Sequence, residues 1–171
     1  MAKRFKEINR QIEDNMLGKA DDSKEESEAP KERYSAEEQL TADSRAWKET
    51  LREAWKGNML DSTMLPVMQT PVALKLVGVP DYPMVMRQSK LMKIKKDHPE
   101  MTKAILNQLP SYLADPMIIF KSSTVPGRLV VGLELKDEAG IHVVVPVELN
   151  AKAGRVDVNV ITSAYGKGVQ Q

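Results

Sequence analysis

The stretch RLVVGLELKDEAGIHVVVPVELNAKAGRVDVNVIT, residues 128–162, decides the fold class. Apolar and polar side chains alternate along much of it, which is the period of a β-strand. The connections that contain Gly140 and Gly154 are short, and such connections favour antiparallel hairpins over crossovers. Pro146 falls inside a strand and predicts a bulge or a local edge. The strands expected are 117–120, 128–135, 141–149 and 155–162.

Helical patterns precede these strands. Ser89 can cap a helix that runs to about Asp97, and His98-Pro99-Glu100 resembles a fresh helix start, because proline suits the first helical position. The second helical segment reaches about residue 114. Shorter strand-like stretches lie at 67–79 and 83–86. We therefore predict an α+β domain over residues 61–171, with the helices packed on one face of a four-stranded antiparallel sheet, a meander.

The first sixty residues differ from the rest, and we predict a charged helical N-terminal extension over 1–60. A helix is expected over 2–17, a charged linker over 20–33 and a second helix over 35–56. Trp47, Leu51 and Trp55 form a sparse apolar stripe on that second helix. Either this helix lies on the main domain, or the three side chains bind a protein partner.

Composition excludes several classes of protein. The chain has 171 residues, with 25 Lys and Arg against 24 Asp and Glu, so it is not a uniformly basic nucleic-acid coat. Cysteine is absent, which excludes thiol catalysis and disulfides. No Walker, Rossmann, zincin or serine-hydrolase motif occurs, and the two histidines lie on separate segments, so we expect no cofactor and no metal. Without a long apolar run or an N-terminal signal, we expect a cytoplasmic protein that spans no membrane.

The densest positive charge lies in RQSKLMKIKK, residues 87–96, which holds five basic residues and no acid. Lysines and arginines on one helix face can contact phosphates, although a charged run can also be a solvated surface. The candidate nucleic-acid-binding residues are Arg87, Lys90, Lys93, Lys95, Lys96 and Ser122.

A phosphodiester-cleaving site can be assembled from residues near this run. His98 can act as a general acid or base, and Lys121 can stabilise developing negative charge. Thr162 and Tyr165, at the end of the last strand, can donate hydrogen bonds to phosphate oxygens. The alternative is that His98 caps a helix and that the hydroxyls serve turns. The candidate catalytic residues are His98, Lys121, Thr162 and Tyr165.

The run KLMKIKKDHPEMTKAILNQLPSYLADPMIIFKSS, residues 90–123, followed by two hairpin strands and VNVITSAYGK, resembles the C-terminal domain of phage MuF-type and polyvalent proteins. The similarity extends over about residues 65–168. Those domains are related to the barnase, EndoU, colicin and RelE nucleases. The resemblance implies a phage or prophage setting and an RNA-cleaving activity, and His98, Lys121, Ser122, Thr162 and Tyr165 lie on the resembling motifs.

Three functional hypotheses follow. The first is a toxin-like, metal-independent endoribonuclease with RNA as its partner. The second is a catalytically inactive phage accessory protein that binds and inhibits a host defence factor or a phage factor. The third is a virion-associated protein. The oligomeric state is left open.

Overall fold

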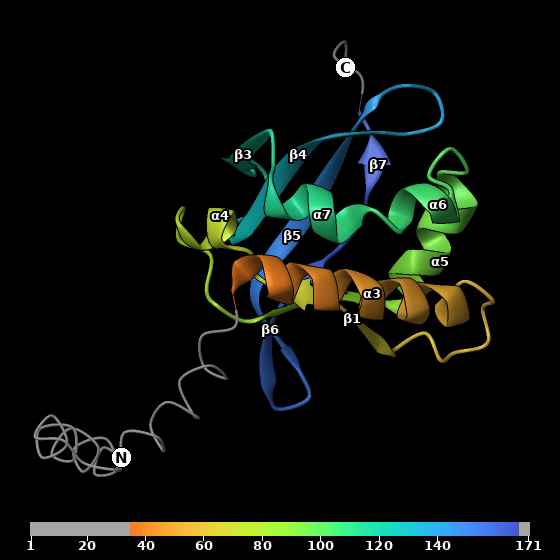
Figure 1. Ribbon diagram of the computed structural model, residues 1–171, viewed down its shortest axis with the longest axis horizontal. Coiled ribbons are helices and arrows are strands. Elements are labelled where there is room, and N and C mark those ends of the chain that lie inside the picture. Colours follow the sequence, from red (N-terminus) through yellow and green to blue (C-terminus); the bar gives the residue numbers. More distant parts are fainter. Residues whose placement is uncertain (1–34, 168–171) are drawn as a thin grey trace, which may run out of the picture. The chain divides into compact units, whose positions relative to one another are not determined.

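A computed structural model describes residues 35–167 of the chain (Figure 1). The predicted helix over 2–17 and the charged linker over 20–33 lie outside the described residues. The compact unit begins at Ala36, so the helix assigned to the extension packs within it. Its helices are α3 (Ala36–Ala54), α4 (Val72–Lys75), α5 (Gln88–Asp97), α6 (Lys103–Leu106) and α7 (Leu109–Ala114). Its strands are β1 (Met64–Gln69), β2 (Pro83–Arg87), β3 (Ile118–Lys121), β4 (Arg128–Lys136), β5 (His142–Ala153), β6 (Val156–Ile161) and β7 (Tyr165–Gly166).

The α+β class is confirmed, but the predicted sheet is too small. All seven strands of the described residues join one mixed sheet in the order β1-β2-β6-β5-β4-β3, and β7 pairs with β5. The four meander strands are present as β3, β4, β5 and β6, each antiparallel to its neighbour. The prediction of a purely antiparallel meander is wrong, because β2 pairs with β6 in parallel and brings β1 with it.

The reason for the larger sheet lies in the segment before the helices. Met84, Val85 and Met86 are all buried, so β2 is covered on both faces, as a central strand of a sheet must be. The chain then leaves the sheet through α5, α6 and α7 before it returns as β3, and a long excursion of this kind permits parallel pairing.

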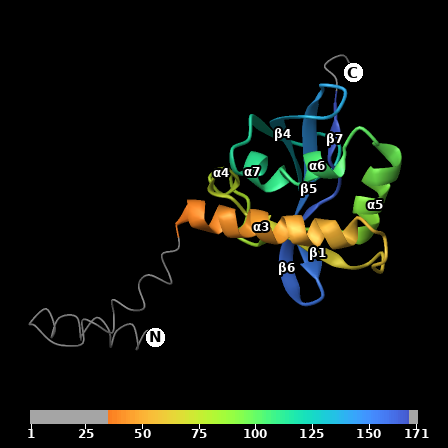
Figure 2. The same cartoon turned by 45° about the vertical axis from the view of Figure 1, so that its right-hand side comes forward.

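The main core lies between one face of the sheet and the helices (Figures 1 and 2). Trp47 and Leu51 of α3 are fully buried in it, and the indole Nε1 of Trp47 donates a hydrogen bond to the carbonyl of Leu106 at 2.8 Å. The opposite face has only a small buried cluster around Val85, Val158 and Val160. No helix in residues 35–167 is long and apolar enough to cross a membrane.

Pro146 lies where β5 changes partners, so the predicted irregularity is confirmed. Val147 pairs with Ile161 of β6, and Val144 pairs with Tyr165 of β7. Between these pairs the β6–β7 side holds one residue more than β5, which is a bulge. The carbonyl of Pro146 accepts hydrogen bonds from the backbone N–H and the hydroxyl of Thr162.

Candidate functional site

His98 terminates a helix instead of starting one. It is the C-cap of α5, and its backbone N–H donates to the carbonyl of Ile94 at 2.8 Å. The next helix, α6, begins at Lys103, with the Thr102 hydroxyl accepting a hydrogen bond from the N–H of Ile105. The prediction of a helix start at His98-Pro99 is therefore wrong, because the capping hydroxyl of Thr102 sets the start four residues later.

The imidazole of His98 stacks on the phenol ring of Tyr165. The two ring centroids are 5.2 Å apart and the planes are inclined by 17°. The carboxylate of Glu100 lies 3.8 Å from Nδ1 of His98, and both side chains are about one-third exposed. Two candidate catalytic residues, separated by 67 positions in the chain, thus meet at a solvent-accessible edge of the sheet.

The second histidine lies near this stack. Val144 pairs with Tyr165, and the N–H of Lys167 donates to the carbonyl of His142 at 3.0 Å, so the β5–β7 ladder continues to His142 and Lys167. Side chains two apart on a strand share a face, and diagonal neighbours lie about 7–8 Å apart. His142 is therefore a diagonal neighbour of Tyr165.

Lys136 completes this row, because it pairs directly with His142 across β4 and β5. Lys136, His142 and Lys167 are exposed and lie side by side on the face of the sheet opposite the main core. We use "the His98–Tyr165 site" for His98, Glu100, Lys136, His142, Tyr165 and Lys167. Its imidazoles, ammonium groups and phenol are the groups that acid–base chemistry on a phosphodiester requires.

A buried carboxylate organises the loop beside the site. One oxygen of Asp137 accepts the N–H groups of Ala139 and Ile141, each at 2.9 Å. The N–H of Glu138 donates to the carbonyl of Glu100, which joins this loop to the turn after α5. Asp137 also lies so close to Gly166 that no side chain fits at position 166. Strand β7, the loop at residues 137–141 and the end of α5 are thus held together around the stacked rings of His98 and Tyr165.

Lys121 and Ser122 lie elsewhere. Lys121 pairs with Leu129 of β4, whose side chain points into the main core, whereas Tyr165 shares the opposite face with Val144. Two strands separate β3 from β7, which places the backbones roughly 14 Å apart at about 4.8 Å per strand. The Ser122 hydroxyl accepts the N–H groups of Thr124 and Val125, so it serves a turn.

The four candidate catalytic residues therefore do not converge. His98 and Tyr165 meet, Lys121 lies across the sheet, and the Thr162 hydroxyl is engaged with the carbonyl of Pro146 at the bulge. On the Tyr165 face of the sheet, Lys167 lies two residues after Tyr165, and Lys136 lies across β5, paired with His142.

Part of the basic run is paired within the molecule. Lys93 donates to Asp97 at 2.9 Å; this hydrogen bond lowers the pKa of the Asp97 carboxyl and raises the pKa of Lys93. Lys95 donates to the carbonyl of Trp55 at 2.8 Å and lies 5.0 Å from the centre of its ring. Arg87 and Lys90 are half-buried, and Lys96 is exposed.

The proposed partner-binding stripe lies largely inside the molecule. Trp47 and Leu51 have no exposed surface, and Trp55 is half-buried beneath Lys95. This arrangement favours the alternative in which the second helix covers the main domain. Partner binding through Trp47 and Leu51 would require α3 to leave the core.

Residues 90–171 match the family model described as the phage MuF C-terminal domain. This part of the chain, just under half of it, is similar to that family. The match is shorter than the similarity expected over residues 65–168, and α3, β1, α4 and β2 precede it. No curated protein and no solved structure matches the chain.

Within residues 90–171, four residues of the site were not predicted from the sequence: Glu100, Lys136, His142 and Lys167. The alternation of Val143, Val145 and Val147 in the core does indicate that His142 faces the other side. Its closeness to Tyr165 depends on the bulge at 162–164, which no local pattern reveals. Among the described residues, no three His, Asp or Glu side chains gather closely enough to hold a metal ion.

Proposed function

We propose that the MuF C-terminal domain of this chain cleaves RNA without a metal, at the His98–Tyr165 site. The observation that supports this most directly is the stacking of His98 on Tyr165, with a second histidine and two lysines on the neighbouring strand positions. The family match supports a phage setting and is silent on the reaction.

The proposed reaction is an internal transfer within the RNA strand. One histidine takes the proton from a ribose 2′-hydroxyl while the oxygen attacks the adjacent phosphorus. The other histidine donates a proton to the 5′-oxygen as its bond to phosphorus breaks. The products are a 2′,3′-cyclic phosphate and a 5′-hydroxyl, and protons and charges balance across the step.

The remaining groups have supporting roles in this proposal. Lys136 and Lys167 stabilise the additional negative charge of the pentacoordinate phosphorus, and the phenol of Tyr165 fixes the plane of the His98 ring. Glu100 lies on the Nδ1 side of His98 and leaves Nε2 for the substrate.

The test is cleavage of a mixed RNA pool in EDTA by the full chain. His98→Ala and His142→Ala should each lower the rate roughly 100- to 10,000-fold, as expected when a general acid or base is removed. Lys136→Ala should lower it less. Lys152→Ala, an exposed lysine paired with Asp157 on the β5–β6 hairpin, serves as the matched control and should leave the rate unchanged.

The chemical nature of the products gives a second readout. Wild-type cleavage should leave cyclic phosphate ends that resist ligation until they are opened. If folded wild-type protein leaves all RNA intact, or if both histidine variants retain full activity, the proposed function is wrong.

A further inference from the structure

The face of the sheet opposite the main core is open along β3, β4 and β5. Leu129, Val131 and Val145 point into the core and are at most 6% exposed, so the alternate residues of these strands point the other way. All five helices of residues 35–167 contribute side chains to the main core and therefore pack on the core side. The small buried cluster of the opposite face lies over β2 and β6.

Two rows of mostly apolar side chains cross this open face. By direct pairing of the strands, the first row is Ile118, Gly132, Val144 and Tyr165, and the second is Phe120, Val130 and Pro146. A Cβ at Gly132 would lie 2.7 Å from Cγ2 of Ile118, which places both residues on the same face. Ile118 and Phe120 are 53% and 47% exposed. We call these two rows the outer face, and Tyr165 belongs both to it and to the His98–Tyr165 site.

Basic groups lie at both ends of the outer face. Beyond Tyr165 is the row of Lys136, His142 and Lys167. Beyond Phe120, Arg128 lies directly opposite Glu148 across β4 and β5, and the buried Nε of Arg128 has no hydrogen-bond partner. The outer face is thus an apolar and aromatic surface between two groups of cations.

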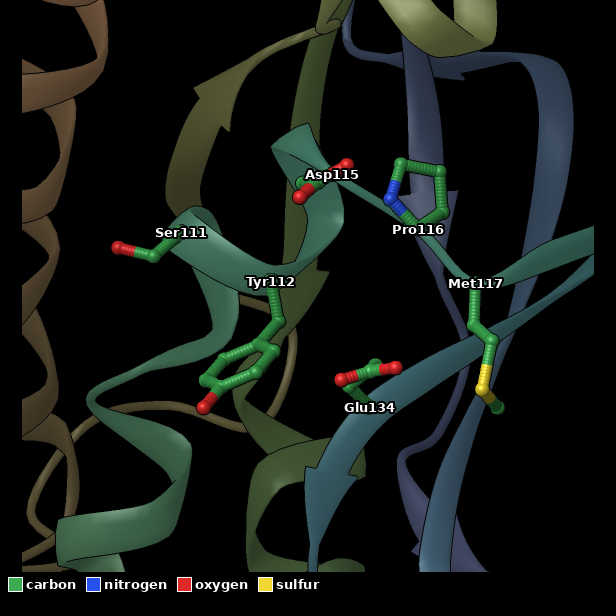
Figure 3. Close-up of a pocket in the computed structure, with 6 residues that line it drawn as sticks. All are labelled: Ser111, Tyr112, Asp115, Pro116, Met117 and Glu134. Carbon is green, nitrogen blue, oxygen red and sulfur yellow. The ribbon is translucent and has the colours of Figure 1, made fainter.

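The carboxylate of β4 is turned toward a helix. The pairing of β4 with β5 shifts between Gly132 and Lys136, and Glu134 falls in this interval. Glu134 lines a pocket of about 320 Å³ with Tyr112 of α7 and Met117, and Figure 3 shows its carboxylate beside the Tyr112 ring. The acid that remains beside the outer face is Glu148.

We propose that the outer face binds the bases of single-stranded RNA, with Phe120 as a stacking platform. The proposal rests on the proposed function, because a strand cleaved at the His98–Tyr165 site would continue across the same face. Bases of a single strand stack on exposed aromatic rings, whereas the bases of a duplex are already stacked and paired. The cations at both ends suit the phosphates, and Glu148 suits an exocyclic amino group of a base.

The shared residue Tyr165 favours the substrate as the occupant. A protein that covered the outer face would also cover Tyr165 and block the site. The backbones of β3 and β7 lie roughly 14 Å apart, at about 4.8 Å per strand, whereas phosphates of one stacked strand are about 3.4 Å apart. Phe120 therefore contacts a different nucleotide from the one that reacts beside His98.

The test is fluorescence anisotropy of the full chain with a labelled single strand of mixed sequence that carries 2′-O-methyl riboses. The blocked 2′-oxygen cannot attack phosphorus, so binding is measured without cleavage. Phe120→Ala should raise the dissociation constant roughly 5- to 150-fold, the loss expected for one stacked base, and Phe120→Tyr should retain the affinity. Leu76→Ala, at an apolar side chain that is 80% exposed on the loop after α4, is the matched control and should change nothing.

Two further probes show whether bases make the contact. The duplex of the same sequence should bind at least tenfold more weakly than the single strand. A strand in which spacers replace the bases should bind equally to the wild type and to Phe120→Ala, because it has nothing to stack on the ring. Circular dichroism of each variant confirms that it is folded.

The outcomes separate this proposal from the proposed function. A wild type that binds the single strand no better than the duplex, or a Phe120→Ala variant with wild-type affinity, overturns the outer face as the base-binding surface, even if RNA is still cleaved. Binding that depends on Phe120 in a protein that cleaves no RNA would support the outer face and contradict the proposed function.

Discussion

At the scale of single residues, the His98–Tyr165 site depends on what surrounds its rings. Tyr165 is followed by Gly166, which packs against the buried carboxylate of Asp137. That carboxylate holds the loop whose Glu138 binds the turn after His98. The backbone angles of Gly166 are ordinary, so glycine is required at this position because a larger residue would not fit.

Gly166→Ala tests this packing. The added methyl would collide with Asp137, which has little freedom because one of its oxygens accepts two N–H groups. We expect a loss of about 1–3 kcal/mol in the free energy of unfolding, the usual cost of overpacking, measured by urea denaturation.

Gly132→Ala is the comparison for that variant. Its methyl would lie 2.7 Å from Cγ2 of Ile118, a methyl group on the Cβ of a half-exposed side chain that can turn about its Cα–Cβ bond. It should therefore cost less than Gly166→Ala. The reverse order would show that Asp137 can move freely and does not hold the loop.

At the scale of elements, β6 is tied to the β1–β2 connection by one buried amide. Nδ2 of Asn159 donates to the Thr70 hydroxyl and to the carbonyl of Pro80, each at 3.0 Å, and Oδ1 accepts the N–H of Asn150. Asn159 has no exposed surface. These bonds fix the end of β1 and the start of the β2 segment beside β6.

Asn159→Ala should therefore destabilise the domain more than a surface change on the same strand. It removes the amide donor from the buried Thr70 hydroxyl and from the half-buried carbonyl of Pro80, and a buried group that loses its partner costs about 1–3 kcal/mol. The urea midpoint should fall clearly, whereas Asp157→Ala, which breaks an exposed ion pair with Lys152, should barely move it. Equal midpoints for the two variants would show that water replaces the amide without cost.

Local patterns predicted the elements better than their assembly. The hairpin strands follow from alternation and glycine turns, and α3 and α5 follow from apolar spacing. The predicted Ser89 cap is wrong, because α5 begins at Gln88 and its N-cap residue, Arg87, makes no side-chain hydrogen bond. The parallel pairing of β2 with β6 is a contact between distant segments, and nothing in Pro83–Arg87 specifies its neighbour. The same limit applies to the site. His98 and Tyr165 were predicted as site residues from the chemistry of their side chains, but whether His142 and Lys121 lie near them depends on the order of the strands in the sheet.

At the scale of the whole molecule, α3 belongs to the fold. A chain that begins at residue 61 would lack Trp47 and Leu51, which are fully buried against α7 and the sheet. Removing such side chains costs about 3–5 kcal/mol for a tryptophan and 2–5 kcal/mol for a leucine. The sum is comparable to the total stability of an ordinary domain, about 5–15 kcal/mol. Fragment 61–171 should therefore not fold cooperatively.

The measurement is thermal unfolding of two fragments, 35–171 and 61–171, by circular dichroism beside the full chain. Fragment 35–171 keeps α3 and the hydrogen bond from Trp47 to Leu106, so we expect a single cooperative transition. In full-chain Trp47→Phe, the carbonyl of Leu106 loses that donor, and the midpoint should fall by an intermediate amount. If fragment 61–171 melts cooperatively at the midpoint of fragment 35–171, α3 contributes nothing to stability and the domain boundary lies at residue 61. Loss of the transition in fragment 61–171 alone would instead place the boundary before Ala36.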